Sequence, residues 1–228
     1  MTQGQFTTLR RDFRVGTEQI DVKPSYDLGH LGDFDYTQIT KMQSMTPERR
    51  WQRFKRWRRL LKKSNSMSPI LDDIVSRFAK HQVEFVIVGG VSAVLQGAAV
   101  NTFDLDICYR RTPENIAKLV AALKPLGPLP RGFPKDLPFV FDERTIQLGS
   151  NFTFDVGEED LDLLGTMSAI GGYEEIIQGT VEMEILGFKV KVLSLEQLIA
   201  TKEAAGRQKD LLALPLIKAA LAIKQQTN

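Results

Sequence analysis

Two aspartates with one residue between them, Asp104 and Asp106, lie within the apolar run from Phe103 to Tyr109. A β-strand alternates its side chains, so both carboxylates are expected on one face and their apolar neighbours on the other. Adjacent acids on a strand repel each other unless a cation lies between them. Carboxylate oxygens are hard ligands that suit Mg²⁺ or Mn²⁺. The pair therefore indicates a metal site on a strand.

A diglycine, Gly89-Gly90, follows the β-branched run Val86-Ile87-Val88 and precedes a short helical segment. Bare glycines let a polyanion approach the backbone, and free N–H groups at a helix start favour negative charge. Alone, a Gly-Gly is usually a tight turn, and an Asp-x-Asp on a strand is usually a solvated edge. Their spacing within one strand–helix–strand unit predicts a site for a metal–nucleotide complex.

A third carboxylate could come from a neighbouring strand. The run Asp160–Leu164 reads as a strand that places Asp160 and Asp162 on one face, and the preceding run Gly149–Val156 contributes Asp155. An acid delivered toward Asp104 and Asp106 would complete a three-carboxylate cluster. The residue pattern leaves all three acids open as the third member.

The periodic segments alternate between strand and helix, which predicts a mixed α/β (α+β) fold with helices flanking the sheet and a helical pair at the C-terminus. The expected strands are 85–88, 103–109, 149–156, 160–164, 180–186 and 188–193, and the expected helices are 68–81, 91–96, 112–123, 194–206 and 207–224. Thr112 and Ser194 are expected N-caps. The irregular segment 124–140 carries Arg131 and Lys135, either as a lid that reaches a triphosphate or as an ordinary structural loop.

The N-terminal region differs in character from the rest. Residues 1–45 show no sustained periodicity and are expected to form a poorly ordered arm, followed by a basic amphipathic helix at 46–66 and the main domain at 67–228. Between Thr46 and Ser64 nine Lys/Arg face one acid, so this segment carries +8 and the remainder of the +2 chain carries −6. Trp51, Phe54 and Trp57 form an apolar stripe.

Two functions fit the basic helix. It either packs its aromatic stripe on the domain and solvates its arginines, or it contacts an RNA backbone, because Lys and Arg neutralise phosphates and aromatic rings can stack on bases. The residues expected to bind nucleic acid are Arg49, Arg53, Arg56, Arg59 and Lys62.

Composition narrows the class of protein. With 43% hydrophobic and 25% charged residues, the 228-residue chain is typical of a globular protein. A single cysteine, Cys108, excludes an internal disulfide, and with two scattered histidines it argues against zinc. No apolar run is long enough for a membrane span or a secretory signal, so a cytoplasmic location without membrane contact is expected.

Several motifs together carry a family resemblance. The series Gly-Gly, short helix and Thr-x-Asp-x-Asp beginning at Thr102 resembles the first motif of the nucleotidyltransferase superfamily, most of all its AbiEii-type (MenT-like) toxin branch. The stretch from Lys202 to Asp210 is similar to the C-terminal Lys-x-x-Ala-Gly-Arg-x-Lys-Asp motif. The runs 109–115 and 151–153 are also shared, and the resemblance covers about residues 70–225. One departure is Val100, where many relatives have an arginine.

The resemblance implies roles for named residues. Asp104, Asp106 and Asp162 would bind Mg²⁺ or Mn²⁺ and act catalytically, because the third acid of the family begins an Asp-Leu-Leu sequence. Lys202 would neutralise the triphosphate. The nucleotide would be bound by Gly89, Gly90, Ser92, Thr102, Lys202, Arg207 and Asp210.

The implied function is transfer of an NMP from an NTP to a hydroxyl acceptor, with the basic helix favouring an RNA such as the tRNA end. Relatives of this type act as toxins, which implies an antitoxin partner. The alternatives are a protein-modifying (AMPylating) transferase and a non-catalytic nucleotide-binding or antitoxin-like module. Val100 favours the non-catalytic module, whereas the intact acids and Lys202 oppose it.

Overall fold

The computed structural model describes residues 13–15, 18–20, 37–62, 70–134, 137–167 and 169–227, with side chains from Thr37 onward except at positions 59–70 and 227. The strands are β1 (Phe13–Val15), β2 (Glu18–Ile20), β3 (Phe85–Ile87), β4 (Asp104–Tyr109), β5 (Leu129–Pro130), β6 (Asn151–Val156), β7 (Glu159–Leu164), β8 (Thr166–Met167), β9 (Gly171–Gly172), β10 (Thr180–Ile185) and β11 (Phe188–Leu193).

The helices begin and end as follows: α1 (Thr37–Gln43), α2 (Pro47–Lys62), α3 (Ile70–Lys80), α4 (Gly89–Leu95), α5 (Pro113–Leu123), α6 (Glu143–Leu148), α7 (Tyr173–Ile176), α8 (Leu195–Ala205) and α9 (Gln208–Thr227), with 3₁₀ turns η2 (Lys124–Leu126) and η3 (Ile177–Gly179). No helix in the described ranges is long and apolar enough to span a bilayer.

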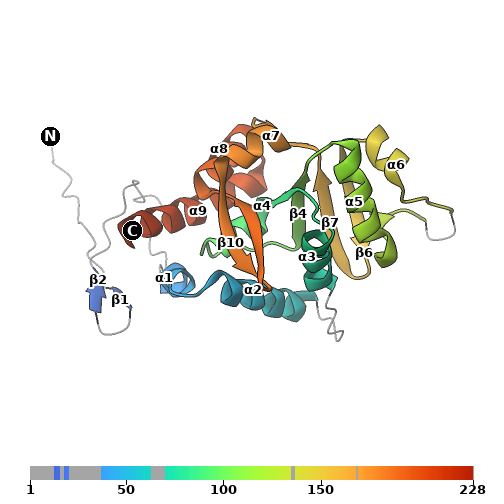
Figure 1. Cartoon of the computed structure of the whole chain (residues 1–228). Helices are drawn as coiled ribbons and strands as arrows, with labels where there is room; N and C mark the ends of the chain where they lie inside the picture. The colour runs from blue at the N-terminus through green and yellow to red at the C-terminus, as the bar shows by residue number, and fades with distance from the viewer. Residues whose placement is uncertain are drawn as a thin grey trace.

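A seven-stranded mixed sheet organises the molecule, in the order β10-β11-β3-β4-β7-β6-β5 (Figure 1). The pairs β11–β3 and β4–β7 are parallel, and the other pairs are antiparallel. The expected mixed α/β fold is confirmed. The hairpin β10–β11 turns at Leu186-Gly187, where both residues have positive φ, as a two-residue turn that follows the strand twist requires.

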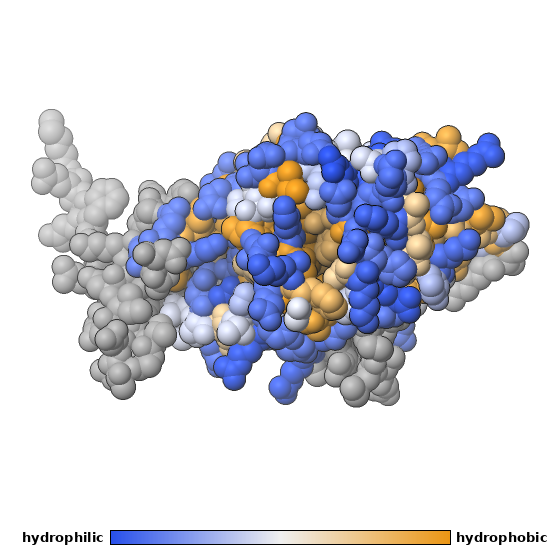
Figure 2. Space-filling model, in the orientation of Figure 1, coloured by the Kyte–Doolittle hydropathy of each residue, from blue (hydrophilic) through white to orange (hydrophobic). Residues whose placement is uncertain are grey.

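Alternating side chains divide the core into two layers, one on each face of the sheet. Leu105 and Ile107 of β4 belong to the layer with α3, α5 and α6, and Cys108 belongs to the layer with α7, α8 and α9. Asp104 and Asp106 share the face of Cys108 but are only partly buried. The outer surface on the side of α3 and α5 is mainly hydrophilic, with scattered apolar patches (Figure 2).

Helices α1 and α2 pack against the folded core. Ile39 of α1 and Trp51 of α2 are fully buried, and Trp51 packs in the same layer as β3 and β4. Thr46 caps α2, accepting from Arg49 N at 3.3 Å, and Pro47 is the first helical residue. The arm was expected to reach residue 45, but α1 begins at Thr37. Most of 1–36, and 63–69, lie outside the described residues.

Other local expectations hold with small shifts. Helix α4 begins at the glycines themselves, two residues before the expected start. Thr112 and Ser194 are the N-caps of α5 and α8, accepting from Asn115 N and Gln197 N. The short helices α6 and α7 were not expected, because six or four residues hold too little periodicity to detect.

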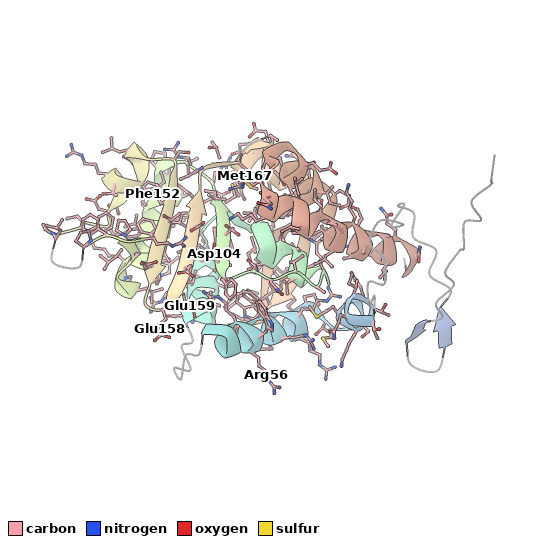
Figure 3. The ribbon with its side chains drawn as sticks, turned by 180° about the vertical axis from the view of Figure 1, so that it is seen from behind. Arg56, Asp104, Phe152, Glu158, Glu159 and Met167 are labelled. Carbon is pink, nitrogen blue, oxygen red and sulfur yellow. The ribbon has the colours of Figure 1, made fainter. Side chains whose placement is uncertain are left out.

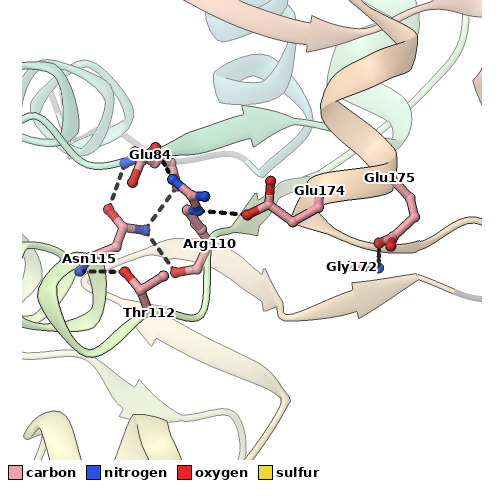
Figure 4. Close-up of polar contacts among 7 residues, drawn as sticks. All are labelled: Glu84, Arg110, Thr112, Asn115, Gly172, Glu174 and Glu175. Atoms are coloured by element: carbon pink, nitrogen blue, oxygen red, sulfur yellow. Dashed lines mark hydrogen bonds and ion pairs between the residues drawn. The ribbon is translucent and has the colours of Figure 1, made fainter.

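The shared run 109–115 has a structural role at the end of β4 remote from the acids (Figure 4). Arg110 pairs with Glu84 at 2.9 Å and with Glu174 at 2.6 Å. The amide of Asn115 donates to the carbonyls of Glu84 and Arg110 and accepts from Glu84 N. These contacts join the start of β3 to the start of α5.

Arg50 joins three elements by binding backbone carbonyls. Its buried guanidinium donates to Met42 O at 2.7 Å, Gln43 O at 2.8 Å and Leu95 O at 2.6 Å, at the C-terminal ends of α1 and α4. A cation at a helix C-terminus satisfies carbonyls that have no partner within the helix. Burial lowers the pKa of this arginine below its ordinary value.

We expect Arg50→Met to lower the free energy of unfolding by about 3 kcal/mol, because buried carbonyls lose charge-assisted hydrogen bonds. The neighbouring exposed Arg49 is the matched control, and Arg49→Met should change stability by about 0.5 kcal/mol or less. Urea unfolding followed by circular dichroism measures both. Equal midpoints for the two variants would contradict a role for Arg50 in docking α2.

Candidate functional site

The parallel pairing of β4 and β7 places four carboxylates side by side. In the register, Asp104 is opposite Asp160 and Asp106 is opposite Asp162. Partners in adjacent strands point to the same face, so these acids form two rows on one side of the sheet. The next strand continues the rows with Asp155 beside Asp160 and Thr153 beside Asp162.

The diglycine lies against this cluster. Gly89 has φ +61°, and a Cβ there would lie 1.9 Å from the Oδ2 atom of Asp106. A Cβ at Gly90 would lie 2.5 Å from Thr102 Oγ1. Only glycine permits this approach of the β3–α4 backbone to the acid strand. The structure therefore brings Gly89, Gly90, Thr102 and Asp106 together.

The side chain of Ser92 is buried beneath the glycine turn. Its side chain is fully buried, and its hydroxyl donates to the carbonyl of Gly89 at 2.7 Å. It fixes the glycine turn in this conformation, and its contact with a nucleotide stays a prediction. Val100 is partly buried against both core layers.

Burial and neighbouring acids raise the pKa of Asp106 and of Asp162. Burial raises the pKa of Asp106 to about 7, and the charges of Asp162 and Asp104 add to that effect, while Lys202 and Lys209 oppose it. Burial also raises the pKa of Asp162, with Asp104 and Asp160 contributing and Arg131 opposing. Without a bound cation, Asp106 therefore binds a proton near neutral pH.

Two arginines, each from a segment distant in sequence, lie beside the acids of β6 and β7. Arg58 of α2 is buried, pairs with Glu159, lies 3.7 Å from an Asp160 oxygen, and donates through Nε to the carbonyl of Phe103. Glu159 lies between α2 and the sheet, below Asp104 (Figure 3).

Arg131 reaches the same row from the other side. Its Nη2 donates to Asp162 Oδ1 at 2.9 Å, its Nε lies 3.5 Å from Asp155, and its backbone N–H donates to Thr153 O at 2.9 Å. Phe133 and Phe139 of the same segment contact each other, and Phe139 contacts Phe154 of β6. Through Arg131 and Phe139 the described part of the segment 124–140 thus contacts the sheet, and Lys135 lies outside the described residues.

These contacts separate the three candidate third acids. Asp155 is one strand farther from β4, and Asp162 lies opposite Asp106, the acid that the Gly89 backbone approaches. Because Asp160 and Asp162 each lie beside an arginine, this position opposite Asp106 is what favours Asp162, and its role as the third acid stays a prediction. The carboxylate donor set suits Mg²⁺ or Mn²⁺. In the described ranges, however, no three acidic, histidine or cysteine side chains are gathered as a ready metal site.

The C-terminal motif adds a cation beside the acids. Lys202 Nζ donates to Asp210 Oδ1 at 2.6 Å, and Arg207 Nε donates to Oδ2 at 2.9 Å. Asp210 is 4% exposed; its burial raises its pKa, but the hydrogen bond and charge of Lys202 and the charge of Arg207 outweigh this and lower it. Gly206, with φ +60°, ends α8 so that Lys202 and Asp210 meet.

The basic helix has two kinds of arginine. Arg49, Arg53 and Arg56 are exposed, and Arg56 projects from the outer side of α2 (Figure 3). Arg50 and Arg58 are buried, which the charge count alone did not indicate. The side chains of Arg59 and Lys62 lie outside the described residues.

Sequence reasoning missed the contribution of Arg58, and it assigned Arg131 to a triphosphate or to solvent. Arg58 could have been found, because it follows Phe54 by four residues and Trp51 by seven, on the buried stripe of α2. Lys209, whose charge lowers the pKa of Asp106, lies in the Lys202–Asp210 motif, but no pattern in the sequence assigned it a role of its own. No local pattern pointed to the pairing of Arg131 with Asp162.

Comparisons with known proteins give structural neighbours at low identity. No protein-family model and no curated protein matches the sequence. The crystal structure of ANT(2'')-Ia with adenylyl-2''-tobramycin is 18% identical, with a TM-score of 0.45 over 69% of this chain and 91% of that chain. A solution structure of the same antibiotic-resistance factor has the same identity and TM-score, covering 69% and 85%. A candidate nucleotidyltransferase from Thermotoga maritima is 18% identical, with a TM-score of 0.43 over 64% and 88%.

The raised pKa of Asp106 predicts a pH-dependent stability. Its pKa of about 7 in the folded chain exceeds the ordinary 3.8, so the folded state binds this proton more tightly than the unfolded state. That stabilisation is fully present below about pH 4 and is lost as pH rises to 7. In metal-free buffer, Asp106→Asn should therefore be more stable than wild type at pH 8, by roughly 4 kcal/mol at most, and the gain should shrink toward pH 4.

Thermal unfolding between pH 4 and pH 8 measures this difference. Glu184→Gln, which removes one carboxylate from an exposed position on β10, is the control and should show no comparable trend. A gain from Asp106→Asn that does not depend on pH would contradict the raised pKa.

Proposed function

We propose that this chain is a metal-dependent nucleotidyltransferase that moves an NMP from an NTP to a hydroxyl acceptor. The observation that carries the proposal is the alignment of Asp104 and Asp106 with Asp162 across β4 and β7, directly beside the backbone of Gly89-Gly90. Clustered acids beside a glycine turn fit a polyphosphate and its counter-cations. The sequence motifs of the nucleotidyltransferase superfamily fall on these same residues.

The reaction forms a bond between the acceptor oxygen and the α-phosphorus and breaks the bond from that phosphorus to pyrophosphate. Asp104, Asp106 and Asp162 would hold Mg²⁺ or Mn²⁺, which neutralises phosphate charge and polarises the reacting oxygens when bound. Gly89 and Gly90 let the backbone of the β3–α4 turn lie against Asp106 and Thr102, and the triphosphate would bind beside this turn.

The remaining groups handle charge and the proton. Asp162, whose pKa is raised by burial and by its acidic neighbours, would accept the proton of the acceptor hydroxyl once Arg131 leaves it. Lys202 would stabilise the departing pyrophosphate, and Asp210 positions Lys202 and Arg207 through its two oxygens.

The proposed acceptor is an RNA end, such as that of tRNA, and the proposed biological role is a cytoplasmic toxin with an antitoxin partner. The exposed row of Arg49, Arg53 and Arg56 supports a polyanionic acceptor. An AMPylating transferase is the alternative if protein takes up the nucleotide. A non-catalytic nucleotide-binding module is the second candidate, favoured by the Arg131–Asp162 pair and by Val100.

Incubation with each α-³²P-NTP, Mg²⁺ and total tRNA tests the activity. We expect label on RNA with the wild-type chain, and a loss of at least about a thousandfold with Asp104→Ala/Asp106→Ala, because catalysis by metal ligands is lost. Label on protein instead would identify the AMPylating alternative. Nucleotide binding without transfer to RNA or protein would favour the non-catalytic module.

Arg131 is expected to compete with metal for Asp162. Arg131→Gln should bind Mn²⁺ about fivefold more tightly in calorimetry, the effect of roughly 1 kcal/mol between unit charges in a hydrated site. Arg110→Gln removes the same charge at the opposite end of β4 and should leave Mn²⁺ affinity unchanged (Figure 4). Equal affinities for wild type and Arg131→Gln would show that the arginine does not guard the carboxylate.

A further inference from the structure

An aromatic pair lies where α2 meets the start of β4. The ring centroids of Trp57 and Phe103 are 5.6 Å apart, with 32° between the ring planes. Phe103 is 42% exposed and Trp57 is partly exposed. The other tryptophan, Trp51, is fully buried and donates from Nε1 to Asp72 at 2.7 Å. A surface aromatic pair leaves apolar area in water, and its rings are free to take a further partner.

The pair is fixed at the edge of the acid site. Phe103 immediately precedes Asp104, and Thr102 lies against Gly90. Arg58, the residue after Trp57, donates to the carbonyl of Phe103 and pairs with Glu159. The two rings therefore lie on α2 and at the start of β4, which the contacts of Arg58 join to each other.

The same stretch of α2 presents positive charge. Arg53 lies one helical turn before Trp57, Arg56 is adjacent to Trp57, and both arginines are exposed. Figure 3 shows Arg56 projecting away from the body of the molecule. From Arg49 to Arg56 the helix advances about 10 Å. This span is longer than a single phosphate group, so the arginines fit successive phosphates along a polymer. A base on the rings and a backbone along the arginines is the usual arrangement for single-stranded nucleic acid.

We propose that Trp57 and Phe103 form a stacking platform for an unpaired base of single-stranded RNA, whose phosphates contact Arg49, Arg53 and Arg56. This inference rests on the proposed function only in taking that RNA as the acceptor. The platform ends beside Asp104, so a strand bound along α2 has its end directed at the acids. A base inside a duplex is stacked on both faces and cannot reach the rings, so the platform favours unpaired bases.

The two tryptophans make the platform measurable by fluorescence. The full-length protein is titrated in EDTA, without NTP, with a short single-stranded RNA, with the same RNA annealed to its complement, and with an abasic phosphodiester of equal charge. We expect saturable quenching by single-stranded RNA, because a stacked base quenches Trp57 while Trp51 stays buried. The duplex and the abasic polymer should quench little.

Variants separate stacking from charge. Phe103→Ala should weaken single-stranded RNA binding about tenfold, within the range for loss of one base–aromatic stack, and should leave abasic-polymer binding unchanged. Arg53→Gln/Arg56→Gln should weaken both and reduce the salt dependence. Trp57→Phe should remove the quenching. Leu148→Ala, a change at an 80% exposed apolar residue of α6, is the control and should alter nothing.

Three results overturn the platform: equal binding of RNA and abasic polymer, unchanged RNA affinity in Phe103→Ala, or quenching by NTP alone that RNA competes away, which would assign the rings to the nucleotide. Its failure is distinct from that of the transferase. Base-dependent quenching without label transfer leaves the platform standing, whereas label on RNA that is insensitive to Phe103→Ala removes the platform alone.

Discussion

Like charge across the β4–β7 pair is the constraint on which the rest of the structure depends. Parallel pairing sets Asp104 beside Asp160 and Asp106 beside Asp162, and such neighbours destabilise a sheet unless cations face them. The chain supplies these cations from three separate segments: Arg58 from α2, Arg131 from the segment after β5, and Lys202 from α8. The N-terminal helix, the proline-rich segment and the C-terminal helical pair are thus joined electrostatically to one place on the sheet.

Part of the electrostatic cost of clustering these acids remains in the folded chain, and this bears on function. Burial and neighbouring acids keep the pKa of Asp106 near 7 despite Lys202 and Lys209. A fold selected for stability alone would replace such acids, since well-packed apolar residues of similar size avoid the desolvation penalty. Perturbed carboxylates beside a glycine turn are the arrangement expected where a cation and a polyphosphate complete the charge balance.

Local features of the fold were predictable and long-range ones were not. The β4 strand, the Gly89-Gly90 turn and the caps at Thr112 and Ser194 follow from patterns within a few residues, and the structure has them. The choice among Asp155, Asp160 and Asp162 required the register of β4 with β7, which no local pattern specifies. Arg58 and Arg131 were misjudged because their partners lie far away in sequence, and α1 was missed because seven residues carry little periodicity.

The parallel β4–β7 pairing also has a consequence for how the chain reaches its native state. These strands are separated by two helices, α5 and α6, a 3₁₀ turn and two further strands, so pairing them requires the closure of a long loop. Even then the acids meet without repulsion only when Arg58 and Arg131 have arrived. The four carboxylates come from β4 and β7, so a nascent chain cannot form this cluster before β7, which ends at Leu164, has been synthesised.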